Sequence, residues 1–118
     1  MKLTKKEAVE LHRELWHRIA QREKEDADYA VKEEVFDEIM KERGLEDEDV
    51  INCCFCCEYA YQQKGDEEGS VCVYCPIDWE GKDTCELYYE WMYESDKREL
   101  IRIAEKISDL PLGQYAGE

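Results

Sequence analysis

The first third of the chain carries a helical pattern of apolar positions, with no Gly or Pro in residues 4–43. Thr4 followed by Glu7 predicts a capping box at the helix start. Apolar side chains then recur every three or four residues at Ala8, Leu11, Leu15 and Ile19, and again at Ala27, Val31, Val35 and Ile39. Because residues 22–26 are all charged, the pattern predicts either one long helix or a helical hairpin that bends near Asp26.

Two more helices are predicted near the C-terminus. Asp83 with Glu86, and Asp96 with Glu99, have the spacing of capping boxes. The second of these helices carries an amphipathic stripe made of Leu100, Ile101, Ile103, Ala104 and Ile107. Pro111 is expected to end it.

The middle of the chain has a different character. Residues 62–70 are polar and rich in turn formers, which predicts a solvent-exposed loop. Residues 70–74 favour a short strand, so a small β-hairpin is expected there. The predicted fold is mainly α (small α+β), with a long N-terminal helix or helical hairpin, a central four-cysteine zinc-knuckle/β-hairpin element and two C-terminal helices.

The size of the chain predicts one domain of 118 residues. We divide it into an N-terminal helical arm, residues 1–44, and a zinc core with the C-terminal helices, residues 50–118. A domain this small buries a limited core, so a bound metal is a common supplement. No apolar run approaches a membrane span, and the N-terminus lacks the apolar segment of a signal peptide. A cytoplasmic protein is therefore expected.

The net charge of −15, from 31 acidic and 16 basic residues, restricts the partners. A field of this sign repels phosphate backbones and anionic lipids. Protein partners are therefore favoured over nucleic acids and membranes. In the simplest interpretation, the excess of acidic residues serves solubility. Two more specific interpretations are binding to a basic partner and mimicry of a nucleic acid's charge.

The seven cysteines carry the strongest chemical signal. They are Cys53, Cys54, Cys56, Cys57, Cys72, Cys75 and Cys85. An odd number without an export signal argues against a disulfide framework and favours metal ligands. Two C-x-x-C turns can supply the four corners of a tetrahedral zinc site. Such a site is closed, which makes the zinc structural and leaves no position for a reacting water.

One of the two C-x-x-C turns is ambiguous. Cys72 and Cys75 form the second pair, but the first can be Cys54 with Cys57 or Cys53 with Cys56. Fourteen residues separate Cys57 from Cys72, and the other frame gives fifteen. Spacing alone does not choose between these frames. Successive residues project in different directions, so one frame is expected to bind while the other packs.

The sequence predicts packing roles for Cys85 and for the two histidines. Cys85 is expected to pack at a helix N-terminus, although it could be a spare or substitute ligand. His12 and His17 are five residues apart, whereas a metal pair on a helix prefers four. Neither is predicted to be a ligand, and His12 is expected to pack with Trp16. No base is expected beside Cys85, so catalysis is not predicted.

Nine Tyr and Trp residues follow position 58, at Tyr59, Tyr61, Tyr74, Trp79, Tyr88, Tyr89, Trp91, Tyr93 and Tyr115. Such rings combine a large apolar body with a polar tip. They could pack on the zinc centre as a small core. They could also form a partner surface, because Tyr and Trp dominate interface hot spots.

Residues 54–60 read C-x-x-C-E-Y-A, and residues 72–79 read C-x-x-C-P-[IL]-x-W. These two motifs resemble those of a group of small phage and prophage zinc-binding proteins of unknown function. The stretches at residues 6–16 and 110–112 fit the same group. The resemblance implies that the zinc ligands are Cys54, Cys57, Cys72 and Cys75, and it implies a phage setting. It implies no mechanism, and Cys53 and Cys56 depart from the pattern.

The expected function is that of a phage-type accessory protein with a structural zinc, acting as a protein–protein adaptor or modulator of a host protein in the bacterial cytoplasm. The alternative is a nucleic-acid-related zinc protein, either a DNA-charge mimic or a weak binder. A direct binder would need a basic face within the acidic total. The early candidates for it are Lys2, Lys5, Lys6, Arg13, Arg18, Arg22 and Lys24.

Overall fold

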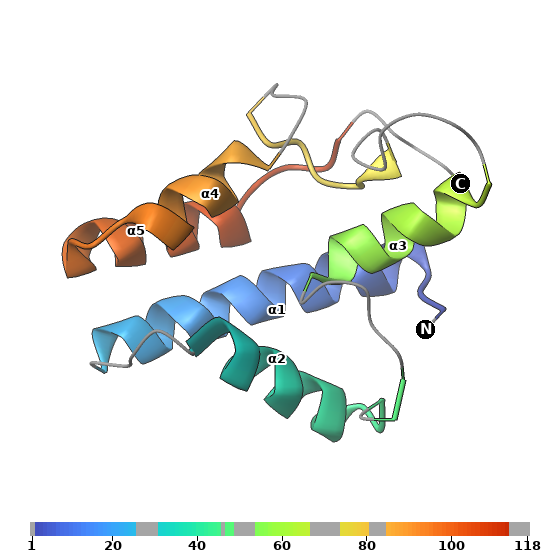
Figure 1. The fold of residues 1–118 in the computed structure, drawn as a ribbon, viewed down its shortest axis with the longest axis horizontal. Coiled ribbons are helices and arrows are strands. Elements are labelled where there is room, and N and C mark those ends of the chain that lie inside the picture. The colour runs from blue at the N-terminus through green and yellow to red at the C-terminus, as the bar shows by residue number, and fades with distance from the viewer. Residues whose placement is uncertain are drawn as a thin grey trace.

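The computed structural model describes residues 2–25, 31–45, 47–48, 54–66, 74–80 and 85–113. The helices in these ranges are α1 (Lys5–Lys24), α2 (Val31–Glu42), α3 (Phe55–Lys64), α4 (Glu86–Tyr93) and α5 (Lys97–Ser108) (Figure 1). The chain is therefore mainly helical, as predicted. In the described ranges, β pairing is limited to an antiparallel bridge between Ile77 and Leu112. None of the helices described is both long and apolar enough to cross a membrane.

The predicted capping box opens α1. The Thr4 hydroxyl accepts from the Glu7 amide at 3.1 Å, and the Glu7 carboxylate accepts from the Thr4 amide at 2.9 Å. Two of the four orphan donors at the helix start are satisfied in this way. The sequence prediction for the start of this helix is confirmed.

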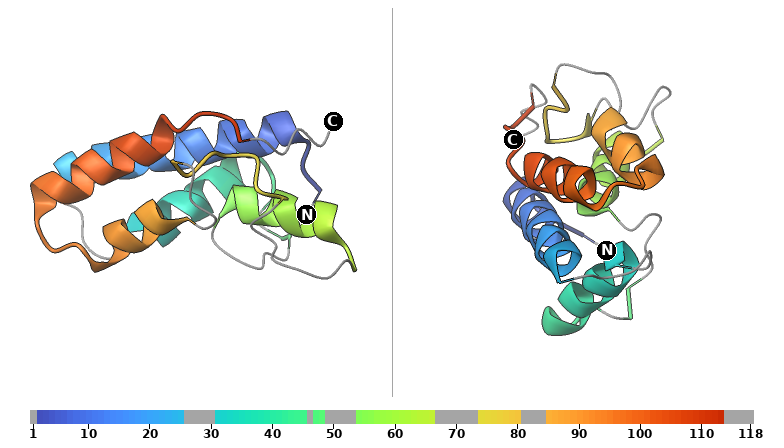
Figure 2. Two further views of the ribbon diagram at one scale, coloured as in Figure 1. Left: turned by 90° about the horizontal axis from the view of Figure 1, so that it is seen from above. Right: turned by 90° about the vertical axis from the view of Figure 1, so that its left-hand side faces the viewer.

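Helix α1 lies at the centre of the bundle and contacts α2, α3 and α5. Figure 2 shows this packing end on, with α5 on one side of α1 and α2 on another. Contacting several partners requires a broad apolar stripe. Its buried members include Ala8, Leu11, Leu15, Trp16, Ile19 and Ala20. These residues recur at helical spacing, so the periodicity of the sequence predicts this buried face.

Two helices, and not one, occupy the N-terminal segment, and α2 runs back along α1 (Figure 1). Four fully buried side chains of α2 face the core: Val35, Phe36, Ile39 and Met40. Their burial removes apolar surface from water and supplies most of the attraction between the helices. Of the two N-terminal alternatives, the structure has the helical hairpin.

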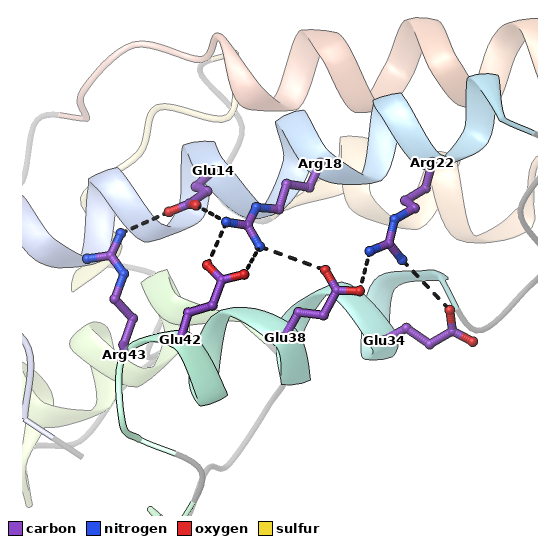
Figure 3. A network of polar contacts seen from close by, with 7 residues as sticks. All are labelled: Glu14, Arg18, Arg22, Glu34, Glu38, Glu42 and Arg43. Carbon is purple, nitrogen blue, oxygen red and sulfur yellow. Dashed lines mark hydrogen bonds and ion pairs between the residues drawn. The ribbon is translucent and has the colours of Figure 1, made fainter.

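Charged side chains follow the edge of the α1–α2 interface (Figure 3). Arg18 contacts Glu14 at 2.5 Å and Glu42 at 2.8 Å, and Arg22 pairs with Glu38. A further pair joins Arg43 to Glu14 at 2.9 Å. The Glu42 hydrogen bond is the main cause that raises the pKa of Arg18 above its ordinary value. We call these residues, together with Glu34, the α1–α2 ion-pair network.

The two predicted C-terminal helices are present as α4 and α5. Asp96 caps α5 by accepting from the Arg98 amide at 2.9 Å, which confirms the cap. The reciprocal half differs from the prediction, because the Asp96 amide donates to Glu94 at 3.0 Å. At the start of α4 the N-cap is Cys85, and Asp83 lies outside the described residues.

A buried polar contact joins α4 to α1. The Trp91 indole N–H donates to the two carboxylate oxygens of Glu23, at 3.1 and 3.3 Å. Glu23 is only 5% exposed. Burial raises the pKa of Glu23, and the hydrogen bond from Trp91 offsets part of that rise. The ring of Trp16 packs edge to face on Trp91, with centroids 5.1 Å apart.

Helix α3 corrects the predicted loop at residues 62–70. Its last turn contains Gln62, Gln63 and Lys64, which had been assigned to the loop. Gln62 holds this turn against the N-terminus, because its amide accepts from the Leu3 amide at 2.8 Å and donates to the Leu3 carbonyl at 3.1 Å. This contact joins residues 59 positions apart, so no local pattern could indicate it. Gly65, with φ of 55°, ends the helix.

The predicted β-hairpin at residues 70–74 lies outside the described residues, apart from Tyr74. The zinc-knuckle part of the fold prediction is incomplete in the same way, because Cys53 and Cys72 also lie outside them. The described neighbour of this region is the chain segment at residues 74–80. It pairs with residues 109–113, which follow α5 and which we call the C-terminal strap, through the bridge of Ile77 with Leu112.

Candidate metal centre

The first cysteine motif lies at the N-terminus of α3. Cys54 is the N-cap residue, and Cys56 and Cys57 stand in the first turn. Residues three apart share a side of a helix, so Cys54 and Cys57 are placed together. Both are partly exposed, whereas Cys56 is fully buried in the core. A helix N-terminus also favours negative charge, which suits a thiolate.

The second motif is held by the strap that follows α5. The Asp78 amide donates to the Pro111 carbonyl at 2.9 Å, and the Gly113 amide donates to the Pro76 carbonyl at 2.8 Å. A Cβ at Gly113 would lie 3.1 Å from the carbonyl carbon of Ile77, so the close approach favours glycine. These bonds flank Cys75, which is partly buried against the core.

The thiols of the two motifs interact. The Cys57 thiol donates to the Cys54 sulfur and is the main cause that holds the pKa of Cys54 well below its ordinary value. The same contact, from the other side, is the main cause that raises the pKa of Cys57. Cys56 likewise donates to Cys75 and lowers its pKa, while burial raises the pKa of Cys56 far above its ordinary value. Each motif thus contains one sulfur whose pKa is lowered by its neighbours.

Further groups lower the pKa of these two sulfurs. The amide of Ile77 and the indole of Trp79 both lower the pKa of Cys75. The amide of Cys57 and the imidazole of His12 do the same for Cys54. Zinc binds thiolates and not thiols. Cys54, Cys57 and Cys75 are sulfur donors of the kind that zinc binds, and the surroundings lower the pKa of two of them, Cys54 and Cys75.

Sequence reasoning missed His12 as a residue of this region. His12 is 0% exposed, and neither of its ring nitrogens has a hydrogen-bond partner in the structure as described. Its ring packs edge to face on Trp79, with centroids 5.7 Å apart. Leaving a buried polar group unpaired costs about 1–3 kcal/mol. A polar residue between Leu11 and Leu15 in a core stripe was the available signal.

The predicted ligands are only partly placed. The structure brings Cys54 and Cys57 together, and Cys75 lies close enough to interact electrostatically with both. Cys72, the fourth predicted ligand, and Cys53, a spare candidate, lie outside the described residues. In the part of the chain that the structure describes, no group of three or more His, Cys, Asp or Glu side chains is arranged to hold a metal ion. The four-cysteine site stays a prediction.

Cys85 is placed at the N-cap of α4, partly buried against the core, as the sequence suggested. It lies near enough to Cys57 to contribute to the raised pKa of that thiol. A role for Cys85 as a substitute ligand stays a prediction.

Comparison with protein-family models found no match to the chain, and comparisons with curated proteins and with solved structures found none either.

Proposed function

We propose that this chain is a small acidic accessory protein of the phage type, which uses a structural zinc ion to hold its shape and binds a protein partner. The observation that carries the proposal is the exposed face of α4. This face presents Tyr89, Met92 and Tyr93, which are 49%, 43% and 82% exposed. Such side chains at a helix surface are typical of protein-binding hot spots.

The spacing of these three residues places them on one side of the helix. Positions i, i+3 and i+4 are neighbours on a helix surface, and Tyr89, Met92 and Tyr93 have that relation. The opposite side of α4 is anchored, because Leu87 and Trp91 are buried in the core. The exposed side chains are thus presented by a fixed element, which lowers the entropic cost of binding.

The chemistry of the partner follows from charge. The α4 face includes exposed Glu86 and Glu90, and the chain carries a net charge of −15. A partner with an apolar patch bordered by Lys or Arg would complement both features. We therefore propose a basic protein surface as the ligand of this face.

Contacts of the early basic residues favour a protein over a nucleic acid. Arg18 and Arg22 pair with glutamates of α2, and Lys24 pairs with Glu105 at 2.8 Å. Arg13 donates to the Leu110 carbonyl at 3.1 Å. These four of the seven early candidates are paired within the chain, which leaves less positive charge for the phosphate-binding face that a direct nucleic-acid binder needs.

The zinc part of the proposal rests on the thiol surroundings. Cys54, Cys57 and Cys75 would hold the ion together with Cys72, and the thiolate-favouring donors around Cys54 and Cys75 support this set. Bound zinc would tie the start of α3 to the segment at residues 74–80. Four thiolates close the coordination sphere, so the ion would hold the two segments together without taking part in a reaction.

The binding experiment compares two sets of variants in zinc-containing buffer at low salt. One combines Tyr89→Ser, Met92→Ser and Tyr93→Ser on α4. The matched control is Tyr61→Ser on α3, an exposed tyrosine far from this face in sequence. Immobilised protein is mixed with bacterial lysate, with captured proteins identified by mass spectrometry, and each one is then purified and titrated.

We expect a basic protein that binds the wild type and the Tyr61 variant alike and binds the triple variant at least ten times more weakly. Its affinity should fall as salt rises. Equal binding of the triple variant would show that α4 is not the interface. A partner that is acidic, or a nucleic acid recovered with comparable affinity, would count against the proposal.

A further inference from the structure

Tyr88 of α4 connects the buried core to the proposed binding face. Its half-buried ring meets Trp16 of α1 edge to face, with centroids 6.0 Å apart, and stacks with Trp91 at 6.3 Å. Toward solvent it contacts the ring of Tyr89, which is tilted by 48° with centroids 5.5 Å apart. Tyr89 belongs to the exposed side of α4. The aromatic side chains therefore form a continuous row from the core to the surface.

The structure places a cation on this row. The ammonium group of Lys32, in the first turn of α2, lies over the Tyr88 ring at 5.1 Å from its centroid. An aromatic face attracts a cation through its quadrupole, and this attraction operates within about 6 Å of the centroid. A side chain of the protein itself thus marks the Tyr88 ring as a face that binds cations.

The contact of Lys32 with Tyr88 is of a kind that a second cation can replace. A cation–π contact at a partly exposed position changes an equilibrium constant by a factor of only about two to five. The ammonium group of lysine is strongly hydrated and stands on a flexible stem. The guanidinium group of arginine is planar, more weakly hydrated and stacks on aromatic rings. Arginine is therefore the better ligand for the same face.

Carboxylates beside the aromatic row favour a ligand of this charge. Four exposed side chains follow one side of α4 at the spacing i, i+3, i+4 and i+7: Glu86, Tyr89, Glu90 and Tyr93. Negative charge and aromatic faces alternate along this stripe. A basic side chain that stacks on a tyrosine there is also attracted by the neighbouring glutamates.

We propose that an arginine side chain of the basic partner binds on the rings of Tyr88 and Tyr89, in the position over Tyr88 that Lys32 takes in the unbound protein. The inference rests on the proposed α4 interface and deepens it, because it names the anchor residue of the partner. Lys32 is then an internal ligand that competes with the partner. Binding releases the Lys32 ammonium group into solvent, so this residue weakens the complex.

The test uses the full chain in zinc-containing buffer, with a short peptide as the probe. The peptide is the acetylated amide of arginine–leucine–arginine, and a second peptide with citrulline in place of arginine keeps the shape without the charge. Lys32→Gln removes the internal cation. The matched control is Lys41→Gln, an exposed position on the same helix that changes the net charge equally. Dissociation constants come from NMR titration of the tyrosine ring signals.

We expect the Lys32 variant to bind the arginine peptide about two to five times more tightly than the Lys41 variant. The ring signals of Tyr88 and Tyr89 should move in the titration, and the citrulline peptide should leave them in place. Adding Tyr88→Leu should abolish the difference between the two lysine variants, because the shared aromatic face is gone. Tyr88→Phe keeps the face and should preserve the difference.

A purely structural role for Lys32, as a clamp between α2 and α4, predicts the opposite sign. Lys32→Gln would then weaken peptide binding and lower the midpoint of thermal unfolding more than Lys41→Gln does. That result, equal affinity of the two lysine variants, or equally tight binding of the citrulline peptide would each overturn the inference. If Tyr88→Leu does not fold, the comparison of the two lysine variants decides, since neither position is buried.

The failure of this inference can be told from the failure of the proposed interface. An arginine peptide that binds neither the wild type nor the Lys32 variant would remove both. So would a peptide that binds the triple serine variant of α4 as tightly as the wild type. Binding that the triple variant loses, with equal affinity in the two lysine variants, would keep the interface and remove only the competing role of Lys32.

Discussion

Helix α1 holds polar groups in opposite surroundings on two of its sides. Facing α2, Arg18 and Arg22 lie at the edge of the interface, partly exposed, and each is paired with glutamates (Figure 3). Facing Trp79 and the start of α3, His12 is fully buried, and its ring nitrogens have no partner among the described residues. The polar groups of the first region are paired within the chain, whereas the ring nitrogens of the second are not paired by any described residue.

The two regions are expected to contribute differently to the free energy of unfolding. Solvent screens the α1–α2 ion-pair network, so its individual pairs contribute little. The buried region has no such screening, so pairing its polar groups matters more. The predictions that follow break one region or the other, and they are ordered by the size of the expected loss.

Metal removal should give the largest effect. Structural zinc sites correspond to about 10–16 kcal/mol of apparent binding free energy, which is comparable with the whole stability of a domain. A strong chelator should therefore abolish or greatly lower the cooperative thermal transition followed by circular dichroism. Re-addition of zinc should restore it, and identical melting with and without chelator would contradict the zinc site.

Single Cys-to-Ser variants sharpen the same point by deciding the ligand frame. Cys54→Ser and Cys75→Ser should lose bound zinc, measured by elemental analysis of the purified protein. Cys56→Ser should retain one zinc per chain, because Cys56 belongs to the packed core. Zinc lost from the Cys56 variant and kept in the Cys54 variant would reverse the assignment.

The apolar strip of the α1–α2 interface should come next. Ile39 is fully buried, and Ile39→Ala should lower the free energy of unfolding by about 2–5 kcal/mol through lost burial and a cavity. Urea denaturation measures this loss. Glu33→Ala, at an exposed position of the same helix, is the control and should stay within about 0.5 kcal/mol of the wild type.

The hydrogen bond between Glu23 and Trp91 is a buried polar contact in which the donor has its acceptor. Glu23→Leu should cost about 1–3 kcal/mol, because it leaves the indole N–H of Trp91 without an acceptor. Glu23→Gln keeps an acceptor and should cost much less. Urea denaturation at neutral pH measures both, and equal losses would show that the hydrogen bond is unimportant.

The same pair predicts a pH dependence. Burial raises the pKa of Glu23 in the folded chain, so between the ordinary glutamate pKa and the raised value the folded state binds more protons than the unfolded state. Its contribution to stability therefore falls as the pH rises through this window. Glu23→Gln should remove this decline, seen as a gain relative to wild type that grows with pH. A constant difference across the window would contradict the raised pKa.

The ion-pair network should give the smallest effect. Arg18→Gln should lower the free energy of unfolding by less than about 1 kcal/mol, since the network is partly exposed. The loss should shrink further in high salt, which screens the wild-type pairs. A loss as large as that of Ile39→Ala would mean that charge pairing, and not apolar burial, holds α2 to α1.

Local patterns predicted much of the fold. The capping box of Thr4 with Glu7 and the cap at Asp96 are contacts within one turn, and both are present. The long amphipathic stripe of α1 was visible as a period in the sequence. Helix α3 was not predicted, because residues 55–64 were assigned to a cysteine turn and a loop. Its last turn is held by the contact of Gln62 with Leu3, and only the folded chain places those two residues side by side.

The site was predicted less completely than the fold. Two C-x-x-C turns indicate thiolate ligands, because this short spacing alone brings two sulfurs close enough to bind one metal ion. His12 was set aside, since a single histidine at helical spacing looks like any core residue. Its burial without a partner, and its contact with Trp79, exist only after α1 meets the segment at residues 74–80.

The sequence by itself determined α1, α4 and α5, the caps at Thr4 and Asp96, the acidic charge and the clustering of the thiols, because these depend on contacts between near neighbours or on composition. The tertiary structure alone decided that α1 is the central helix, that Glu23 meets Trp91, and that His12 packs on Trp79. Each of these joins residues that are far apart along the chain. Such pairs form only when burial of the apolar faces brings the helices together. The apolar pattern of one helix does not indicate which other helix will pack against it.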